Sequence, residues 1–290
     1  MSNIGDKLIG AIRDRGNNNE GGESEMSFFG HLEALRWHLI RSALAILLFT
    51  ILAFSFYSWI YDNIIMAPST NNFWTFRMMC KLGDLLGRPG MCPGKINIHL
   101  INTELAGQFT LQIDSSLMIG LVAGIPYVLF EIWRFVRPAL HDKERKAASG
   151  FVFYASCLFL TGVMFGYFVI TPVSLNFLAG YTVSTSIDNL FSIDSYISSV
   201  STLTLATGLV FELPILVYIL ASLGILTPKF MRESRRYAIV IILIVAAVVT
   251  PTPDALTMTV VAVPLYLLYE ASISVAVLVE KRRKKKELEA

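Results

Sequence analysis

Long runs of apolar residues dominate the hydrophobic and polar pattern of this 290-residue chain. A hydrocarbon core of about 30 Å needs roughly 20 apolar residues in helical form, and runs near that length bounded by charges or turn residues indicate transmembrane helices. Beta-barrel alternation is absent from the sequence. The pattern predicts an all-α polytopic membrane protein with spans at residues 40–61, 109–130, 150–170, 197–221, 237–249 and 257–279.

The fifth run is unusually short. Tyr237–Val249 has thirteen residues, about 20 Å as a helix, and Pro251 and Pro253 end it. Such a helix does not reach across a bilayer of ordinary thickness. Either the membrane thins around it, or the fifth and sixth runs form a re-entrant hairpin; we favour thinning.

Composition agrees with a chain that lipid largely surrounds. Hydrophobic residues make up 54% of the chain and charged residues 16%, with a mean hydropathy of +0.58. We divide it into a flexible or amphipathic cytoplasmic extension at 1–26, a membrane domain at 27–280 and a basic cytoplasmic tail at 281–290. Residues 1–26 lack the apolar core and cleavage site of a removable signal, so we expect this extension to be retained.

The distribution of Lys and Arg predicts the orientation. With the N-terminus in the cytoplasm, all but four of the 24 basic residues lie on the cytoplasmic side. The exceptions share the long loop after the first span, and they are Arg77, Lys81, Arg88 and Lys95. The positive-inside rule therefore places both termini in the cytoplasm.

Two of the three cysteines, Cys80 and Cys92, fall in that outer loop. An outer compartment is oxidising, which favours a disulfide between them. Two free thiols remain the alternative, because the sequence does not show whether their α-carbons approach closely enough.

Acidic residues inside spans need an explanation, because burying a charge in hydrocarbon costs at least about 2.5 kcal/mol. Glu212 lies midway along the fourth span, with Gly208 and Thr204 on the same helix face and Pro214 just after it. It is either a structural Glu bonded within the chain, or a site for a partner helix or a translocating group. For Glu270 and Asp114 we favour structural roles, and we expect Glu131 at headgroup level.

Two segments on the cytoplasmic side place carboxylates among basic residues. One is 31–36, directly before the first span, and the other is 138–145, between the second and third spans. A solvated charge cluster explains either segment alone. If the two meet in space, their carboxylates can clamp a guanidinium group through two parallel hydrogen bonds.

With these segments the chain resembles the TatC family, the receptor subunit of the twin-arginine protein translocase, over residues 27–280. The resemblance rests on motifs that are individually weak and specific in their order. They are His31-Leu32 with Leu35-Arg36, Ala67-Pro68, Trp133 with Phe135 and Pro138-Ala139-Leu140, Glu144-Arg145, Tyr167-Phe168 with Pro172, Phe211-Glu212-Leu213-Pro214, and Thr252-Pro253-Asp254.

This resemblance implies six helices in a concave bundle in a bacterial inner membrane, an outer cap built on the long first loop, and no enzymatic activity or cofactor. The implied partners are signal peptides with paired arginines on folded precursors, single-span TatA- and TatB-like proteins and further copies of this chain, with export driven by the proton-motive force. Glu144 matches the signal-binding carboxylate, beside Arg145. Arg36 closes the N-terminal motif with His31 and Leu35, and Glu212 matches the Glu that faces partner helices. Pro68 and Asp254 match structural positions on the outer side.

Three positions depart from the family pattern. A second signal-binding Glu is replaced by Ala34, and the neighbouring Glu33 points about 100° away on a helix, which puts its role in doubt. Met258 stands where a Gln often follows the outer Asp. Residues 73–93 look like an insertion that carries both cysteines, and no family role extends to it.

The main alternative is a secondary transporter or channel with Glu212 at the substrate or ion site. Such proteins often contain inverted repeats, and we find no convincing internal repeat. An intramembrane enzyme has less support, because no common catalytic motif occurs and none of the four histidines falls inside a predicted span. No ligand cluster indicates a metal site. We expect the basic tail at 281–286 to meet anionic lipid and not nucleic acid.

Overall fold

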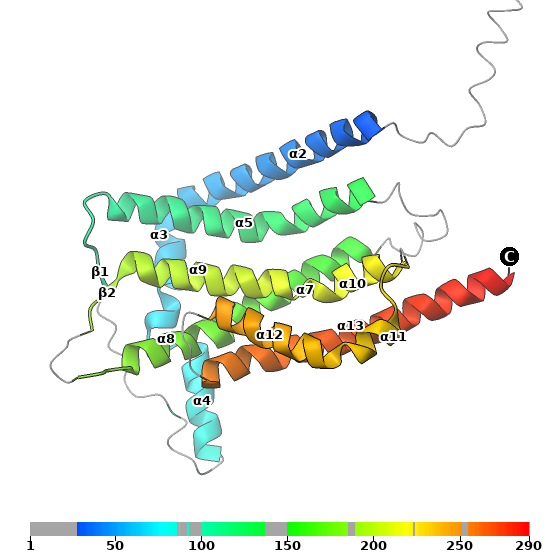
Figure 1. The fold of residues 1–290 in the computed structure, drawn as a ribbon. Helices are drawn as coiled ribbons and strands as arrows, with labels where there is room; N and C mark the ends of the chain where they lie inside the picture. Colours follow the sequence, from blue (N-terminus) through cyan, green and yellow to red (C-terminus); the bar gives the residue numbers. More distant parts are fainter. Residues whose placement is uncertain are drawn as a thin grey trace, which may run out of the picture.

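The computed structural model describes residues 28–85, 87, 92, 100–136, 150–184, 189–222, 224–250 and 255–289. Helices make up nearly all of this part (Figure 1). The main ones are α2 (Phe28–Ser55), α5 (Gly107–Val136), α7 (Phe151–Phe165), α8 (Thr171–Gly180), α9 (Ile193–Val210), α10 (Leu213–Ser222), α12 (Arg235–Val249) and α13 (Ala255–Glu289). Shorter helical segments are α3 (Tyr57–Ile60), η1 (Tyr61–Ile65), η2 (Ala67–Ser69), α4 (Trp74–Leu85), η5 (Gly166–Ile170) and α11 (Pro228–Glu233).

Five helical stretches in the described residues are long and apolar enough to cross a membrane. They are Glu33–Ser55, Gly107–Val136, Val152–Gly180, Ile193–Ser222 and Thr257–Lys281. The fifth predicted span, 237–249, corresponds to α12, which has 15 residues and begins two residues before the predicted start. The chain is therefore an all-helical polytopic membrane protein in which five helices reach full length and one is short.

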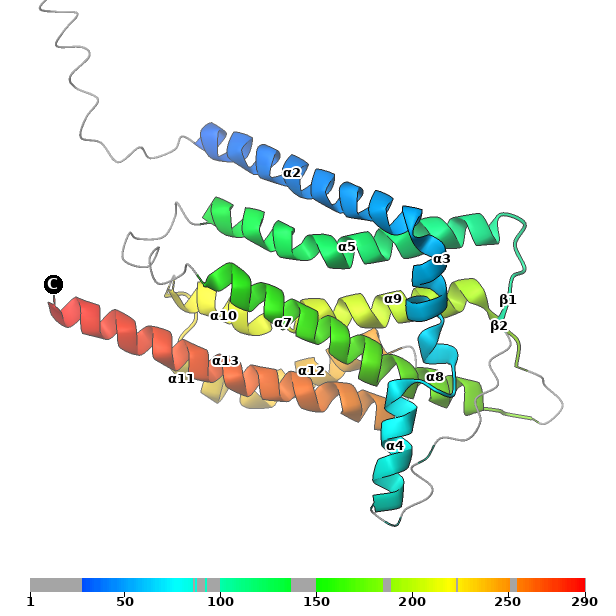
Figure 2. The same ribbon diagram turned by 180° about the vertical axis from the view of Figure 1, so that it is seen from behind.

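The predicted bounds of the first span, 40–61, are wrong at both ends. The apolar helix covers Glu33–Ser55, and the chain then changes direction, so that α3 and η1 run across the bundle (Figure 2). The residues that extended the prediction are mostly aromatic, and Trp and Tyr favour the membrane interface over its core. Hydropathy counts such residues as apolar without showing that the helix has already ended.

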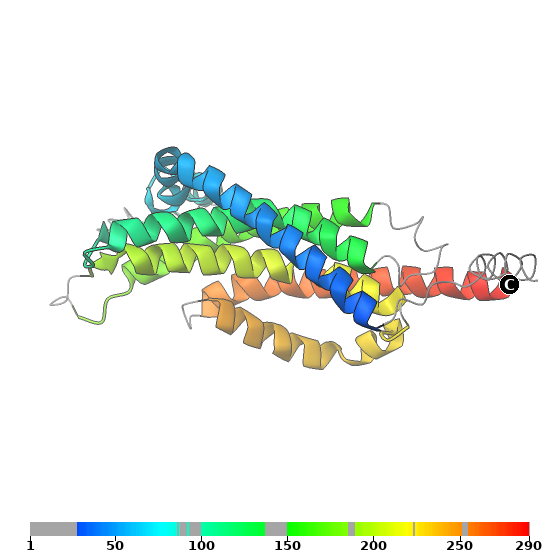
Figure 3. The ribbon, with the colours of Figure 1, turned by 90° about the horizontal axis from the view of Figure 1, so that it is seen from above.

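The first and last helices of the described chain both have their terminal ends at one end of the bundle. We name this the inner end after the predicted orientation, and we name the opposite end the outer end. The start of α2, the end of α5 and the end of α13 all lie there (Figures 1 and 3). Helix α2 packs on α5 at one edge of the bundle, and α12 packs on α13 at another. Helices α7 and α9 lie between these pairs.

Glycine allows the closest approach between helices. A Cβ atom at Gly120 of α5 would lie 2.6 Å from the backbone nitrogen of Thr50 in α2, and Gly124 follows four residues later. Gly166, four residues after Gly162, meets α9 in the same way, with the carbonyl oxygen of Leu203 2.9 Å from its missing Cβ. Small residues at this spacing let membrane helices associate through backbone contact.

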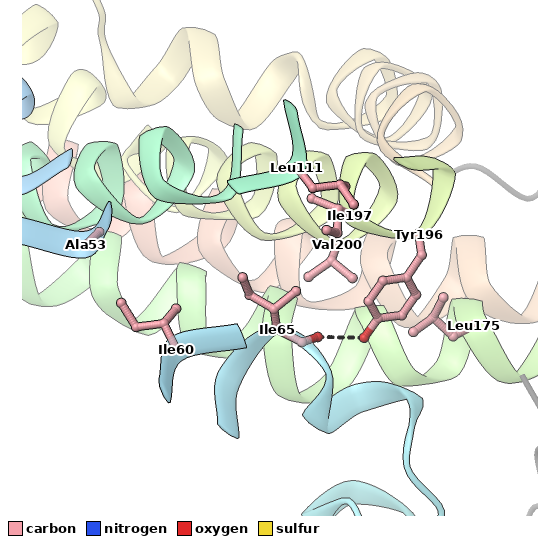
Figure 4. Close-up of a cluster of buried hydrophobic side chains, with 8 residues drawn as sticks. All are labelled: Ala53, Ile60, Ile65, Leu111, Leu175, Tyr196, Ile197 and Val200. Atoms are coloured by element: carbon pink, nitrogen blue, oxygen red, sulfur yellow. Dashed lines mark hydrogen bonds between the residues drawn. The ribbon is translucent and has the colours of Figure 1, made fainter. Parts of the chain in front are cut away.

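The outer half of the bundle has its own apolar core, which includes Leu111, Leu175 and Val200 (Figure 4). Helix ends leave carbonyl groups without partners, and in a membrane they need protein donors. The Tyr196 hydroxyl donates to the carbonyl oxygen of Ile65 at 2.7 Å at the end of η1. Two outer loops are also joined by a parallel pair of two-residue strands, β1 (Leu100–Ile101) and β2 (Phe191–Ser192), a small exception to the all-α prediction.

Candidate functional site

The inner end of α2 carries part of the predicted binding site. Glu33 and Arg36 are exposed there, and Leu35 is half-buried. His31 lies within α2, but its side chain is outside the described part of the structure, as are Glu144 and Arg145 entirely. Among the predicted peptide-binding residues, the structure therefore describes the side chains of Glu33, Leu35 and Arg36.

Glu131 on α5 forms a buried polar cluster that the sequence analysis missed. Its side chain is 1% exposed. Its expected position at headgroup level stays a prediction. His38 Nδ1 lies 2.5 Å from Glu131 Oε2, the Tyr127 hydroxyl donates to Oε1 at 3.0 Å, and Arg41 Nε lies 3.3 Å from Oε2. His38 belongs to the apolar helix Glu33–Ser55, so the prediction that no histidine lies in a span is wrong.

This cluster fixes α2 against α5 at the inner end. His38 and Arg41 are three residues apart on α2, and Tyr127 and Glu131 are four apart on α5, so each pair shares one helix face. A buried carboxylate is stable only when its charge is paired and its lone pairs are bonded. The sequence shows these spacings. It does not show that α2 and α5 pack against each other.

Glu212 lies at a break in the fourth span. Helix α9 ends at Val210 and α10 begins at Leu213, and Pro214 supplies no backbone donor to continue the ladder. Both carboxylate oxygens of Glu212 are buried and have no hydrogen-bond partner in the described part of the chain. A carboxylate held this way needs a donor from outside these residues, or a proton.

Thr204 has different surroundings from Glu212. It is buried and lines a cavity of about 250 Å³ with mostly apolar neighbours, among them Ile65, Val200 and Tyr167, whereas Glu212 is not part of that lining. The predicted stripe is interrupted at Gly208, whose face is covered by side chains of α7. The structure thus separates Thr204 from Glu212 and leaves the carboxylate by itself at the break.

The remaining predicted positions lie in different parts of the chain. Pro68 is buried in η2, and Asp254 lies outside the described residues. Cys80 and Cys92 are joined by a disulfide. Glu270 Oε2 accepts from Arg235 at 2.9 Å, and the described residues include no cluster of three or more His, Cys, Asp or Glu suited to a metal ion.

Known proteins resemble this chain over most of its length. The model of the family described as Sec-independent protein translocase protein (TatC) matches residues 30–264. The TatC protein of Blattabacterium from Periplaneta americana is 33% identical over 221 residues, covering 76% of this chain and 83% of that protein. The TatC of Aquifex aeolicus is 32% identical over 212 residues, covering 73% and 79%.

Solved structures give the same result for the fold. A crystal structure of the twin-arginine translocase receptor TatC in DDM superposes with a TM-score of 0.67 at 31% identity, covering 85% of this chain and 99% of that one. A second crystal structure of this receptor gives a TM-score of 0.63 over 86% of the chain. The agreement of the sequence match and the fold leads to one conclusion: the chain belongs to the TatC family of Sec-independent protein translocase proteins.

Proposed function

We propose that this chain is the receptor subunit of a twin-arginine translocase, and that it binds paired-arginine signal peptides of folded precursors at its inner end. Membership in the TatC family makes it a component of protein transport and not an enzyme. Its receptor role follows from the solved relatives with which it shares fold and sequence. Export would draw on the proton-motive force.

The observation that carries the proposal is the buried Glu131 cluster. It ties α2 to α5, so the exposed Glu33 and Arg36 of α2 and the last turn of α5 stay at the same end of the bundle. Glu33 precedes His38 by five residues, about 7.5 Å along a helix. Glu144 and Arg145 follow α5 in the chain after a short connection. We therefore propose that the two acidic segments converge on one guanidinium pair, with Glu144 as the main acceptor and Glu33 as the second.

The proposed topology places this inner end in the cytoplasm of a bacterial inner membrane. Basic residues such as Arg134, Lys229 and Arg232 occupy the inner end, in agreement with the positive-inside rule. Helix α12 would be a sixth, short crossing, about 22 Å long, and the bilayer would thin around it. Both termini would then be cytoplasmic.

A direct binding measurement tests the receptor role. The purified chain in lipid nanodiscs is expected to bind a signal peptide with paired arginines and to bind the same peptide with paired lysines much more weakly. A planar guanidinium can form two parallel bonds to a carboxylate, and an ammonium cannot. Titration by fluorescence anisotropy measures both affinities. Equal affinities for the two peptides would contradict the proposed site.

Glu212 is proposed to face the helices of single-span TatA- and TatB-like partners. Its buried carboxylate oxygens have no bond to the described residues, so a polar group on a partner helix would remove an energetic cost. Replacing Glu212 by Leu is expected to reduce co-purification of these partners several-fold while leaving twin-arginine peptide affinity unchanged. Quantitative immunoblotting of the purified complex measures the first effect.

A control and a rival outcome sharpen this test. Glu270→Leu removes a carboxylate that Arg235 already pairs, and co-purification should be unaffected. The transporter or channel alternative predicts something different, namely uptake of a small solute by the reconstituted chain alone and loss of that uptake in Glu212→Leu. Solute uptake without any partner would favour that alternative over the proposed role of Glu212.

A further inference from the structure

Helix α4 lies in the long loop after the first span, within residues 73–93 that we interpret as an insertion, and the proposed receptor function assigns it no role. It runs across the direction of the spans and not along them (Figures 1 and 2). Along the bundle axis it lies at the level where α12 ends and α13 begins, while β1, β2 and the start of α5 lie farther out. Helix α4 therefore lies across the bundle axis at the level of the outer end of α12, in the orientation of a helix that lies along a membrane surface.

One face of α4 is anchored firmly to the bundle. Phe73, just before the helix, and Phe76 are buried, and Phe73 stacks on Phe168 with ring centroids 5.6 Å apart. The Thr75 hydroxyl donates to the Phe168 carbonyl. The disulfide between Cys80 and Cys92 ties the second half of the helix to the chain that follows. These contacts fix which side of α4 points away from the bundle.

The outward side combines apolar and cationic residues. Trp74, Met78 and Leu85 are all exposed, and their spacing of four and seven residues places them within about 40° of one another around the helix. Arg77 and Lys81 are exposed and lie on the adjoining side of the same face, within about 60° of Trp74. An apolar strip with a Trp and flanking basic residues is typical of a helix that lies in the membrane interface.

The positions of the two basic residues strengthen this argument. Only four of the 24 Lys and Arg residues lie in the outer loop, and two of these four are on the exposed face of α4. Basic residues on the outer side run against the general distribution, so a local partner of opposite charge accounts for them. We propose that α4 is a surface anchor whose exposed face binds anionic phospholipid in the outer leaflet, with Trp74, Met78 and Leu85 at the acyl boundary and Arg77 and Lys81 on phosphate groups.

Photo-crosslinking in single-copy nanodiscs tests the proposal. A benzophenone amino acid replaces Met78 in the full chain, in discs of phosphatidylcholine with phosphatidylglycerol. The matched control replaces Leu105, a fully exposed apolar residue in the loop between β1 and α5, and this loop lies at the outer tip of the bundle. Mass spectrometry is expected to find lipid adducts at position 78 and several-fold fewer at position 105. Equal yields at both positions, or no lipid adduct at 78, would overturn the proposal.

Two further measurements test the role of the two basic residues and the contact of Trp74 with lipid. Arg77→Gln with Lys81→Gln, and discs without phosphatidylglycerol, should each lower the adduct yield several-fold; an unchanged yield would contradict the role of the basic pair. Without any crosslinker, lipids brominated near the headgroup should quench Trp74, one of four tryptophans, so that Trp74→Phe removes part of the quenching. Capture of a protein at position 78 in native membranes, in place of lipid, would show that a partner covers this face. Peptide binding does not enter any of these readouts, so they fail independently of the receptor function.

Discussion

Replacing Glu144 by Gln is expected to abolish measurable binding of a twin-arginine peptide. The substitution keeps the size of the side chain and removes the charge that makes the two parallel bonds to guanidinium strong. Truncating one partner of a hydrogen-bonded charge pair costs about 2–5 kcal/mol, which is a loss of affinity of at least about 30-fold. Fluorescence anisotropy with the peptide and the purified chain in nanodiscs measures the change.

The loop itself supplies the control. Asp142→Asn removes a carboxylate two residues away in the sequence, and it should leave the affinity within about twofold, because the proposed site assigns it no bond to the guanidinium pair. Glu33→Gln should produce a smaller loss than Glu144→Gln, because its helix face is offset from the position of the usual second acceptor. Unchanged affinity in Glu144→Gln would refute the assignment of this residue as the main acceptor.

Replacing Glu131 by Leu is expected to destabilise the protein by about 3 kcal/mol, because removing one member of a buried ion pair leaves the other without its partner. His38, whose Nδ1 lies 2.5 Å from the carboxylate, would then lose the hydrogen-bond partner of that ring nitrogen, and Arg41 would lose its carboxylate. The double variant His38→Leu with Glu131→Leu should recover most of the loss, since two apolar residues replace the buried pair. Unfolding of the purified chain in mixed detergent micelles measures each free energy.

This cycle has a matched control at the other ion pair. Arg235 and Glu270 are 2.9 Å apart, but the Glu270 side chain is 31% exposed, so solvent screens the pair. Glu270→Leu should therefore cost under about 1 kcal/mol. If the effects of His38→Leu and Glu131→Leu simply add, the two residues do not form the energetic unit that the structure indicates.

Hydropathy and charge were sufficient to predict that the chain is a polytopic membrane protein. Five of the six predicted spans overlap long apolar helices with bounds that shift by up to ten residues, as the third shows, where 150–170 became Val152–Gly180. The transfer of apolar side chains from water to lipid is a local property, and the cost of moving a basic residue across the membrane is local too. The ordered motifs also identified the family, which sequence and fold comparisons confirm.

Hydropathy was a poorer guide where helices end. It ran the first span on to residue 61, whereas the chain turns after Ser55. The fourth span, predicted at 197–221, is one helical stretch at Ile193–Ser222 with an interruption between Val210 and Leu213. Such changes depend on which carbonyls find donors. Tyr196 reaches Ile65 from 131 positions away, and no local pattern contains that pairing.

The sequence by itself determined that this chain is an integral membrane protein, which family it belongs to and which acidic residues need a partner. Only the tertiary structure decided those partners. It shows that Glu131 contacts His38, 93 residues away, and that Glu212 has no hydrogen bond within the described chain. It also shows that α4 runs across the bundle. The physical reason is that burial in lipid is a sum over single residues, whereas a hydrogen bond or an ion pair between helices requires two distant positions to meet in one geometry.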